Sequence, residues 1–137
     1  MQLLITKKFS FEMAHALDSY DGRCRNLHGH SYKLAVTATG SPASKGAKSG
    51  MVVDFGDLKR IVEQTVIEPF DHALVLCKDS PLLAGLPTKT VAVDFQPTTE
   101  NLLMHFARLL EPRMPEGVRL HSLQLQETEN NLAELIL

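Results

Sequence analysis

The sequence predicts an α+β fold, in which helices are segregated on one side of an antiparallel sheet. Apolar and polar residues alternate in two segments near the N-terminus and again near the C-terminus. Two segments between them repeat apolar residues at helical spacing. The predicted order is therefore strand, strand, helix, helix, strand, strand, which is typical of this fold class. The 137 residues are enough for one domain, 1–137, and contain no visible repeat.

The first predicted strand covers residues 3–15. Its apolar residues share one face and are Leu3, Ile5, Phe9, Phe11 and Met13. His15 ends the same series, and a polar loop is expected for 16–27. The second strand is predicted from His28 to about Ala38, with His28 and His30 on its apolar side. An antiparallel pairing of the two strands would therefore bring three histidines together.

The middle of the chain is expected to contain one helix and little other regular structure. A polar, glycine-containing loop is predicted for 40–50, followed by a short strand at 51–53. Asp54 is the expected N-cap of the helix, and Pro69 is expected to end it. Its apolar residues are Phe55, Leu58, Ile61, Val62 and Val66. Prolines and a glycine interrupt residues 70–98, where only 91–95 are expected to form a short edge strand.

A second helix is expected to begin near Thr99, with Thr98 or Thr99 as its cap, and to stop at Pro112. Its apolar stripe consists of Leu102, Leu103, Phe106, Leu109 and Leu110. Two final strands are predicted near 118–128 and 132–137, around a turn at 129–131.

The composition argues against several classes of protein. The formal net charge is −2, whereas a protein that binds nucleic acid by general electrostatics needs a basic surface. No apolar run approaches the length of a membrane span, and the first residues lack the layout of a signal peptide. The two cysteines do not indicate a disulfide framework. We therefore expect a protein of the reducing cytoplasm, without nucleic-acid or membrane partners.

Half of the six histidines lie between residues 15 and 30. His28 and His30 have the spacing that places two side chains on one face of a strand. Imidazole suits zinc, and three histidines with one open position are typical of a catalytic zinc site. The sequence therefore predicts a zinc site formed by His15, His28 and His30.

Cys24 lies close to the predicted zinc site, between two arginines. The spacing leaves two roles open for it. It could be a fourth ligand that closes a structural site, or a thiolate that stands beside the metal as an acid/base group.

Two further places could carry chemistry. An aspartate next to a histidine, as in Asp71–His72, can orient an imidazole for proton transfer, although such a pair taken alone is more often inert.

Glu127 shares strand parity with Leu123 and Leu125, so its carboxylate needs a partner on the apolar side. A ligand with two parallel N–H groups would supply one, and a solvated position beyond the sheet edge is the alternative. No such pattern surrounds Cys77, His105 and His121.

These residues stand in segments that resemble the 6-pyruvoyl-tetrahydropterin synthase family, and the resemblance covers nearly the whole chain. The matching segments are Phe11–His15, Cys24–His30, Val53–Phe55 with Leu58–Lys59, Phe70–His72, Pro97–Glu100 and Gln126–Thr128. Together they are very specific. The chain departs from the family at Phe70, where leucine is usual, and in the long, unfamiliar segment 78–96.

The resemblance implies the tunnelling fold (T-fold), with an antiparallel four-stranded sheet and two helices on one face. Three such chains join in a barrel, and two trimers stack into a homohexamer with active sites between subunits. The resemblance also implies Zn²⁺ on the three histidines, and Cys24 as a catalytic base rather than a ligand. Asp71 and His72 would form an acid/base relay with Cys24. Glu127 would bind the N–H edge of a pterin, helped by backbone around Thr98 and Thr99.

Three residues separate Cys24 from His28, which resembles the bacterial subgroup that forms 6-carboxytetrahydropterin in queuosine biosynthesis. The implied reaction converts 7,8-dihydroneopterin triphosphate into that product, acetaldehyde and triphosphate. Formation of 6-pyruvoyl-tetrahydropterin from the same substrate is the nearest alternative. A noncatalytic zinc-stabilised binding module, with Cys24 as a fourth ligand, is an alternative of another class.

Overall fold

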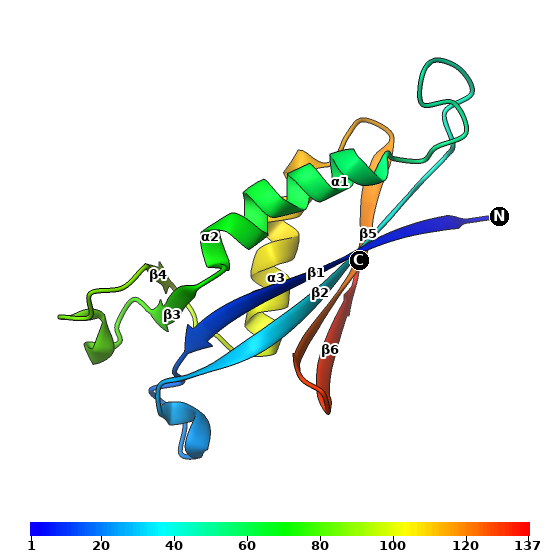
Figure 1. The fold of residues 1–137 in the computed structure, drawn as a ribbon. Coiled ribbons are helices and arrows are strands. Elements are labelled where there is room, and N and C mark those ends of the chain that lie inside the picture. Colours follow the sequence, from blue (N-terminus) through cyan, green and yellow to red (C-terminus); the bar gives the residue numbers. More distant parts are fainter.

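A computed structural model describes residues 1–137 as one six-stranded mixed sheet with the helices α1 and α3 on one face (Figure 1). The strand order is β4-β3-β1-β2-β5-β6. The strands are β1 Leu3–His15, β2 His28–Gly40, β3 Ala73–Cys77, β4 Thr90–Val93, β5 Val118–Thr128 and β6 Asn131–Ile136. The helical elements are α1 Phe55–Val62, a π-helical turn Glu63–Ile67, α2 Glu68–Phe70 and α3 Thr99–Leu110. Short 3₁₀ turns are Arg23–Arg25, Pro81–Leu83 and Glu111–Arg113.

The long hairpin of β1 and β2 confirms the first two predicted strands. They pair antiparallel without interruption, from Leu3 opposite Gly40 to His15 opposite His28. β5 pairs with β2 and β6 with β5, both antiparallel, so the four predicted long strands form one continuous sheet. The register places all three histidines at the same end of that sheet.

The prediction of a four-stranded sheet was wrong, because two shorter strands extend it to six. β3 pairs parallel to β1, and β4 pairs parallel to β3. A parallel strand is covered on both faces and reads as a continuous apolar run. Ala73–Leu76 are all buried, so β3 has none of the alternation that revealed the other strands.

Two details of the first helical region also differ from the prediction. Residues 51–53 form no strand, because Met51 closes the loop through its carbonyl, which accepts a hydrogen bond from the Ala43 amide. Pro69 does not end the helix. A proline lacks the N–H that an α-helix would use, and here a π-helical turn precedes it, so the helical path continues to Phe70. The caps agree with the prediction: Asp54 accepts from the amides of Gly56 and Asp57.

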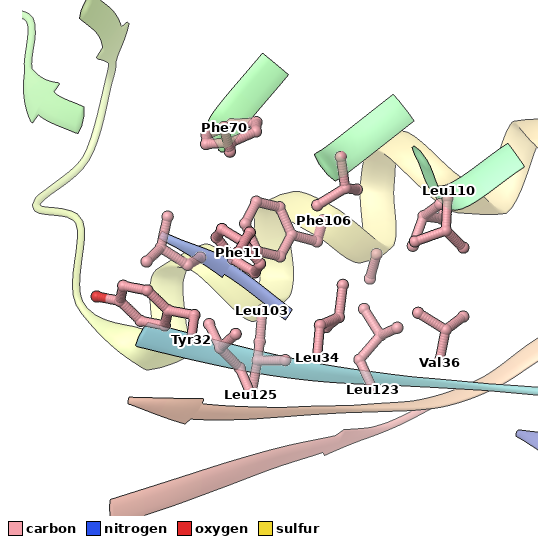
Figure 2. Close-up of a cluster of buried hydrophobic side chains, with 14 of the residues drawn as sticks. Phe11, Tyr32, Leu34, Val36, Phe70, Leu103, Phe106, Leu110, Leu123 and Leu125 are labelled. Carbon is pink, nitrogen blue, oxygen red and sulfur yellow. The ribbon is translucent and has the colours of Figure 1, made fainter. Parts of the chain in front are cut away.

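The core lies between the helices and the sheet (Figure 2). Phe11 on β1 stacks on Tyr32 of β2 at a ring distance of 5.3 Å, and its other neighbour is Phe106 of α3 at 6.3 Å. Leu34 and Val36 continue the same face of β2. The Tyr32 side chain is fully buried and lies at the end of this core that contacts His15. None of the helices has the length and apolar character needed to cross a membrane.

Candidate metal centre and the adjoining pocket

The three predicted metal ligands converge in the structure. One ring nitrogen from each of His15, His28 and His30 lies within 4.8 Å of the others. His15 ends β1, and the other two begin β2, so the hairpin register alone brings them together. Cys24 is not part of this cluster, which favours a role beside the metal over a role as a fourth ligand.

Hydrogen bonds fix the tautomers of two of these rings. His15 Nδ1 donates to the carbonyl oxygen of Pro97 at 2.8 Å, and His28 Nδ1 donates to that of Asn26 at 2.6 Å. A carbonyl oxygen can only accept, so in each neutral ring Nδ1 carries the proton and Nε2 keeps a lone pair. The two Nε2 atoms nevertheless lie only 3.0 Å apart. Two facing lone pairs repel unless a cation lies beside them, so the donor set fits a metal.

Burial keeps His15 and His30 in the neutral form that binds metal. His15 is 1% exposed, and burial is the main cause that lowers its pKa from the ordinary value. The pKa of His30 is also lowered by burial, against the opposing charge of Glu127. Its Nε2 atom is buried without a hydrogen-bond partner. A buried, unpartnered nitrogen aimed at two other lone pairs is a further feature of a ligand set.

Glu127 lies directly beside the histidines. Its Oε1 atom is 3.5 Å from His30 Nε2 and 3.6 Å from His15 Nε2, and the Tyr32 hydroxyl donates to it at 3.5 Å. Burial and the Glu127 charge raise the pKa of Tyr32, which keeps its hydroxyl protonated as a donor. The β5–β6 register shifts between Gln126 and Thr128, and such a bulge re-aims the side chain at its centre. Glu127 thus points at the site and is not solvated beyond the sheet edge.

A pocket of about 410 Å³ adjoins the histidine cluster. Its walls include four residues predicted for the site, namely Cys24, Thr98, Thr99 and Glu127. Thr98 is also the N-cap of α3, since its Oγ1 atom accepts from the Asn101 amide at 3.2 Å. Leu17 and Tyr20 from the loop after β1 complete the apolar part of the wall. This volume suits a bicyclic small molecule whose polar edge faces a carboxylate.

Asp71 and His72 lie elsewhere on the chain. They follow α2 and contact β1, and His72 lines a second pocket of about 350 Å³ with Leu27 and Leu74. His72 Nδ1 is 2.9 Å from Asp71 Oδ1, which also accepts from the Glu12 amide at 2.9 Å. That amide is the main cause that lowers the pKa of Asp71. The two residues form a pair as predicted, but one chain does not bring them into the pocket that Cys24 lines.

Several residues of the site were missed by the sequence analysis. Tyr32 was not singled out from the sequence, although a phenol two positions after His30 on the same strand face was a signal. The carbonyls of Pro97 and Asn26 could not have been found, because any residue offers a carbonyl. A larger cavity of about 490 Å³, with His121 and Arg119 in its wall, contains none of the predicted residues.

Comparison with known proteins gives a consistent result. A model of the family described as 6-pyruvoyl tetrahydropterin synthase matches residues 4–136. The chain is 41% identical to 6-carboxy-5,6,7,8-tetrahydropterin synthase of Haemophilus influenzae, over 95% of this chain and 96% of that protein. It is 32% identical to human 6-pyruvoyl tetrahydrobiopterin synthase, over 96% and 89%. The solved structure of 6-pyruvoyl tetrahydropterin synthase from Caenorhabditis elegans has a TM-score of 0.72 at 25% identity, over 99% and 96%.

Proposed function

Since the chain belongs to the 6-pyruvoyl tetrahydropterin synthase family, we propose that it is a zinc-dependent lyase that converts 7,8-dihydroneopterin triphosphate. One water is consumed, and the products are 6-carboxy-5,6,7,8-tetrahydropterin, acetaldehyde and triphosphate. The observation that carries this proposal is the pair of His15 and His28 Nε2 lone pairs, 3.0 Å apart, beside a pocket that holds both a carboxylate and a thiol. The 41% identical relative favours this product over others. Queuosine biosynthesis and a cytoplasmic location, expected from the sequence, are parts of the same proposal.

His15, His28 and His30 would hold the zinc ion. When bound there, zinc supplies a Lewis acid that polarises oxygen atoms of a ligand. The protein's own contribution is to lower the pKa of His15 and His30 by burial and to orient His15 and His28 through backbone carbonyls. This orientation is in place before any ligand binds, which lowers the cost of assembling the site.

Glu127 binds the pterin. Its carboxylate accepts two parallel hydrogen bonds from the amino and ring N–H groups of the pterin, and this fixes the plane and direction of the ring. The Tyr32 hydroxyl donates a hydrogen bond to the Glu127 carboxylate and so helps to fix its position. Backbone groups at Thr98 and Thr99, at the start of α3, offer further hydrogen bonds to the same ligand.

Cys24 acts as the base that removes a proton from the substrate side chain, and His72, oriented by Asp71, gives or takes a second proton. Within one chain these residues line different pockets. The side chain of His72 is 76% exposed, so it is free to reach a neighbouring chain. We therefore propose that the active site forms between subunits of a homohexamer made of two trimers, with Asp71–His72 of one chain serving Cys24 of another.

The direct test is to incubate the zinc-loaded protein with 7,8-dihydroneopterin triphosphate and to identify the products by mass, together with an acetaldehyde assay. Acetaldehyde and 6-carboxytetrahydropterin are expected. A pyruvoyl product without acetaldehyde would assign the protein to the activity named for the human relative. Absence of any turnover with zinc bound would reject both activities in favour of a binding module.

A further inference from the structure

The segment between β3 and β4 contributes a side chain to the Asp71–His72 turn. Lys89 directly precedes β4, and its backbone carbonyl accepts from the Leu74 amide at 2.9 Å. Its Nζ atom donates to the carbonyl oxygen of Glu68 at 2.6 Å and to that of Asp71 at 2.9 Å. One ammonium group thus joins the start of α2 to the residue that follows its end.

The turn that Lys89 binds has an unfavourable backbone conformation. His72 has φ of +58°, and it is the sole non-glycine residue of the chain in the left-handed region. A residue with a Cβ atom adopts this conformation at a cost of about 1 kcal/mol or more, so the surroundings must hold it there. The His72 amide donates to the Glu12 carbonyl at 2.6 Å, while the Glu12 amide donates to Asp71 Oδ1. β1 therefore holds one side of the turn and Lys89 the other.

The two bonds of Lys89 also suit the charges of this region. Carbonyl groups at the end of a helix have no partner within the helix and carry partial negative charge, which a lysine satisfies. The positive charge of Lys89 further contributes to the lowered pKa of Asp71, after the hydrogen bond from Glu12 and the contact with His72. On the β1 side of the turn, the Glu12 carboxylate accepts a hydrogen bond from Ser31 Oγ at 2.7 Å.

We propose that Lys89 is a positioning residue, which holds the backbone of Asp71 and His72 so that the imidazole is aimed at the neighbouring reaction site. The inference rests on the proposed function, because it assigns work to the Asp71–His72 pair. It also gives a role to the segment 78–96, whose sequence indicated none.

The test compares Lys89→Met with Lys78→Met in the full-length, zinc-loaded protein. Lys78 is an exposed lysine of the same segment, and its side chain makes no hydrogen bond or ion pair, so it controls for loss of charge. With 7,8-dihydroneopterin triphosphate, Lys89→Met is expected to lower kcat about tenfold to a hundredfold and to leave KM and zinc content unchanged. The acid limb of its pH profile is expected to move to higher pH, because the pKa of Asp71 rises without the nearby cation. Lys89→Arg, which keeps the charge and the donors, is expected to restore most of kcat.

A second readout separates this inference from the proposed function. Hydrogen exchange of a peptide that covers 66–77 is expected to be faster in Lys89→Met than in wild type or Lys78→Met, because the His72 amide is less well held. A kcat, pH profile and exchange rate equal to those of Lys78→Met would overturn the role of Lys89. Absence of turnover in the wild type would reject the proposed function, and the exchange measurement alone would then decide whether Lys89 holds the turn.

Discussion

His15 Nδ1 donates a hydrogen bond to the carbonyl oxygen of Pro97 at 2.8 Å, across 82 positions of the sequence. This bond ties the end of β1 to the segment that leads into α3. It fixes the His15 ring so that Nε2 faces His28 and His30, and it places Thr98 at the edge of the same pocket. The candidate metal centre and the pocket lined by Thr98 and Glu127 thus share one support.

Removal of one histidine should abolish tight zinc binding. We expect His28→Ala to lower zinc affinity at least a hundredfold, because two imidazoles remain where three converge. Loss of a group that only hydrogen-bonds to a metal ligand already costs about ten- to a hundredfold. Zinc content per chain after dialysis against a chelator, measured by plasma mass spectrometry, is the assay. His121→Ala is the control, since His121 lines a different cavity. Equal zinc content in both variants would contradict the assigned ligand set.

Local periodicity was sufficient to predict the histidine cluster and most of the fold. The period of two in β1 and β2 places His15, His28 and His30 on one face, and the antiparallel hairpin then leaves a single way to assemble them. The sequence left two threonines, Thr98 and Thr99, as possible N-caps of α3. In the structure the N-cap is Thr98, whose hydroxyl accepts the capping hydrogen bond.

Features that depend on distant partners could not be predicted in this way. β3 pairs with β1 only after the chain has crossed over through the helices, and its continuous apolar sequence matches several structures. Lys89 contacts Glu68 and Asp71 from 21 and 18 positions away, and nothing in its sequence neighbours distinguishes it from an exposed loop lysine. The strand parity of Glu127 was informative, but the bulge that aims it at the histidines was not visible.

Cys24 should behave as a free thiol while zinc is bound. It lines the pocket and lies outside the group of converging ligand atoms, so an alkylating reagent is expected to modify it without release of zinc. Cys24→Ala should retain zinc and lose at least a hundredfold in kcat, which is the range for loss of an acid/base group. Cys77→Ala, at the end of β3, should retain both. Protection of Cys24 until zinc is chelated would instead identify it as a fourth ligand.

The two threonines at the start of α3 should differ in their effect on stability. The Thr98 hydroxyl caps the helix, so Thr98→Ala is expected to lower the free energy of unfolding by about 1 kcal/mol. Thr99→Ala should have a smaller effect, since the Thr99 hydroxyl makes no capping bond. Chemical denaturation of the two variants measures this difference. Equal losses would mean that the cap does not determine stability at this helix end.

His105 should make the stability of the fold depend on pH. Its ring lies between Phe95 at 5.2 Å and Phe70 at 5.9 Å, and burial is the main cause that lowers its pKa below the ordinary value of 6.5. Asp94 opposes this shift, and Arg108 adds to it. Above pH 6.5 the ring is neutral in both the folded and the unfolded chain, and the shift has no effect on stability.

As the pH falls below 6.5, the unfolded chain takes up the proton before the folded chain does, so the free energy of unfolding decreases. His105→Phe removes this proton and keeps an aromatic ring among Phe70 and Phe95. The variant should therefore lose less stability than wild type between pH 6.5 and the lowered pKa, in denaturation series at equal zinc loading. His15 and His30, the proposed metal ligands, also have lowered pKa values, and they contribute equally to both proteins. His121→Phe is the matched control for replacing a histidine by phenylalanine at another position. A His105→Phe curve parallel to that of wild type would show that His105 is accessible enough to be protonated in the folded protein as readily as in the unfolded chain.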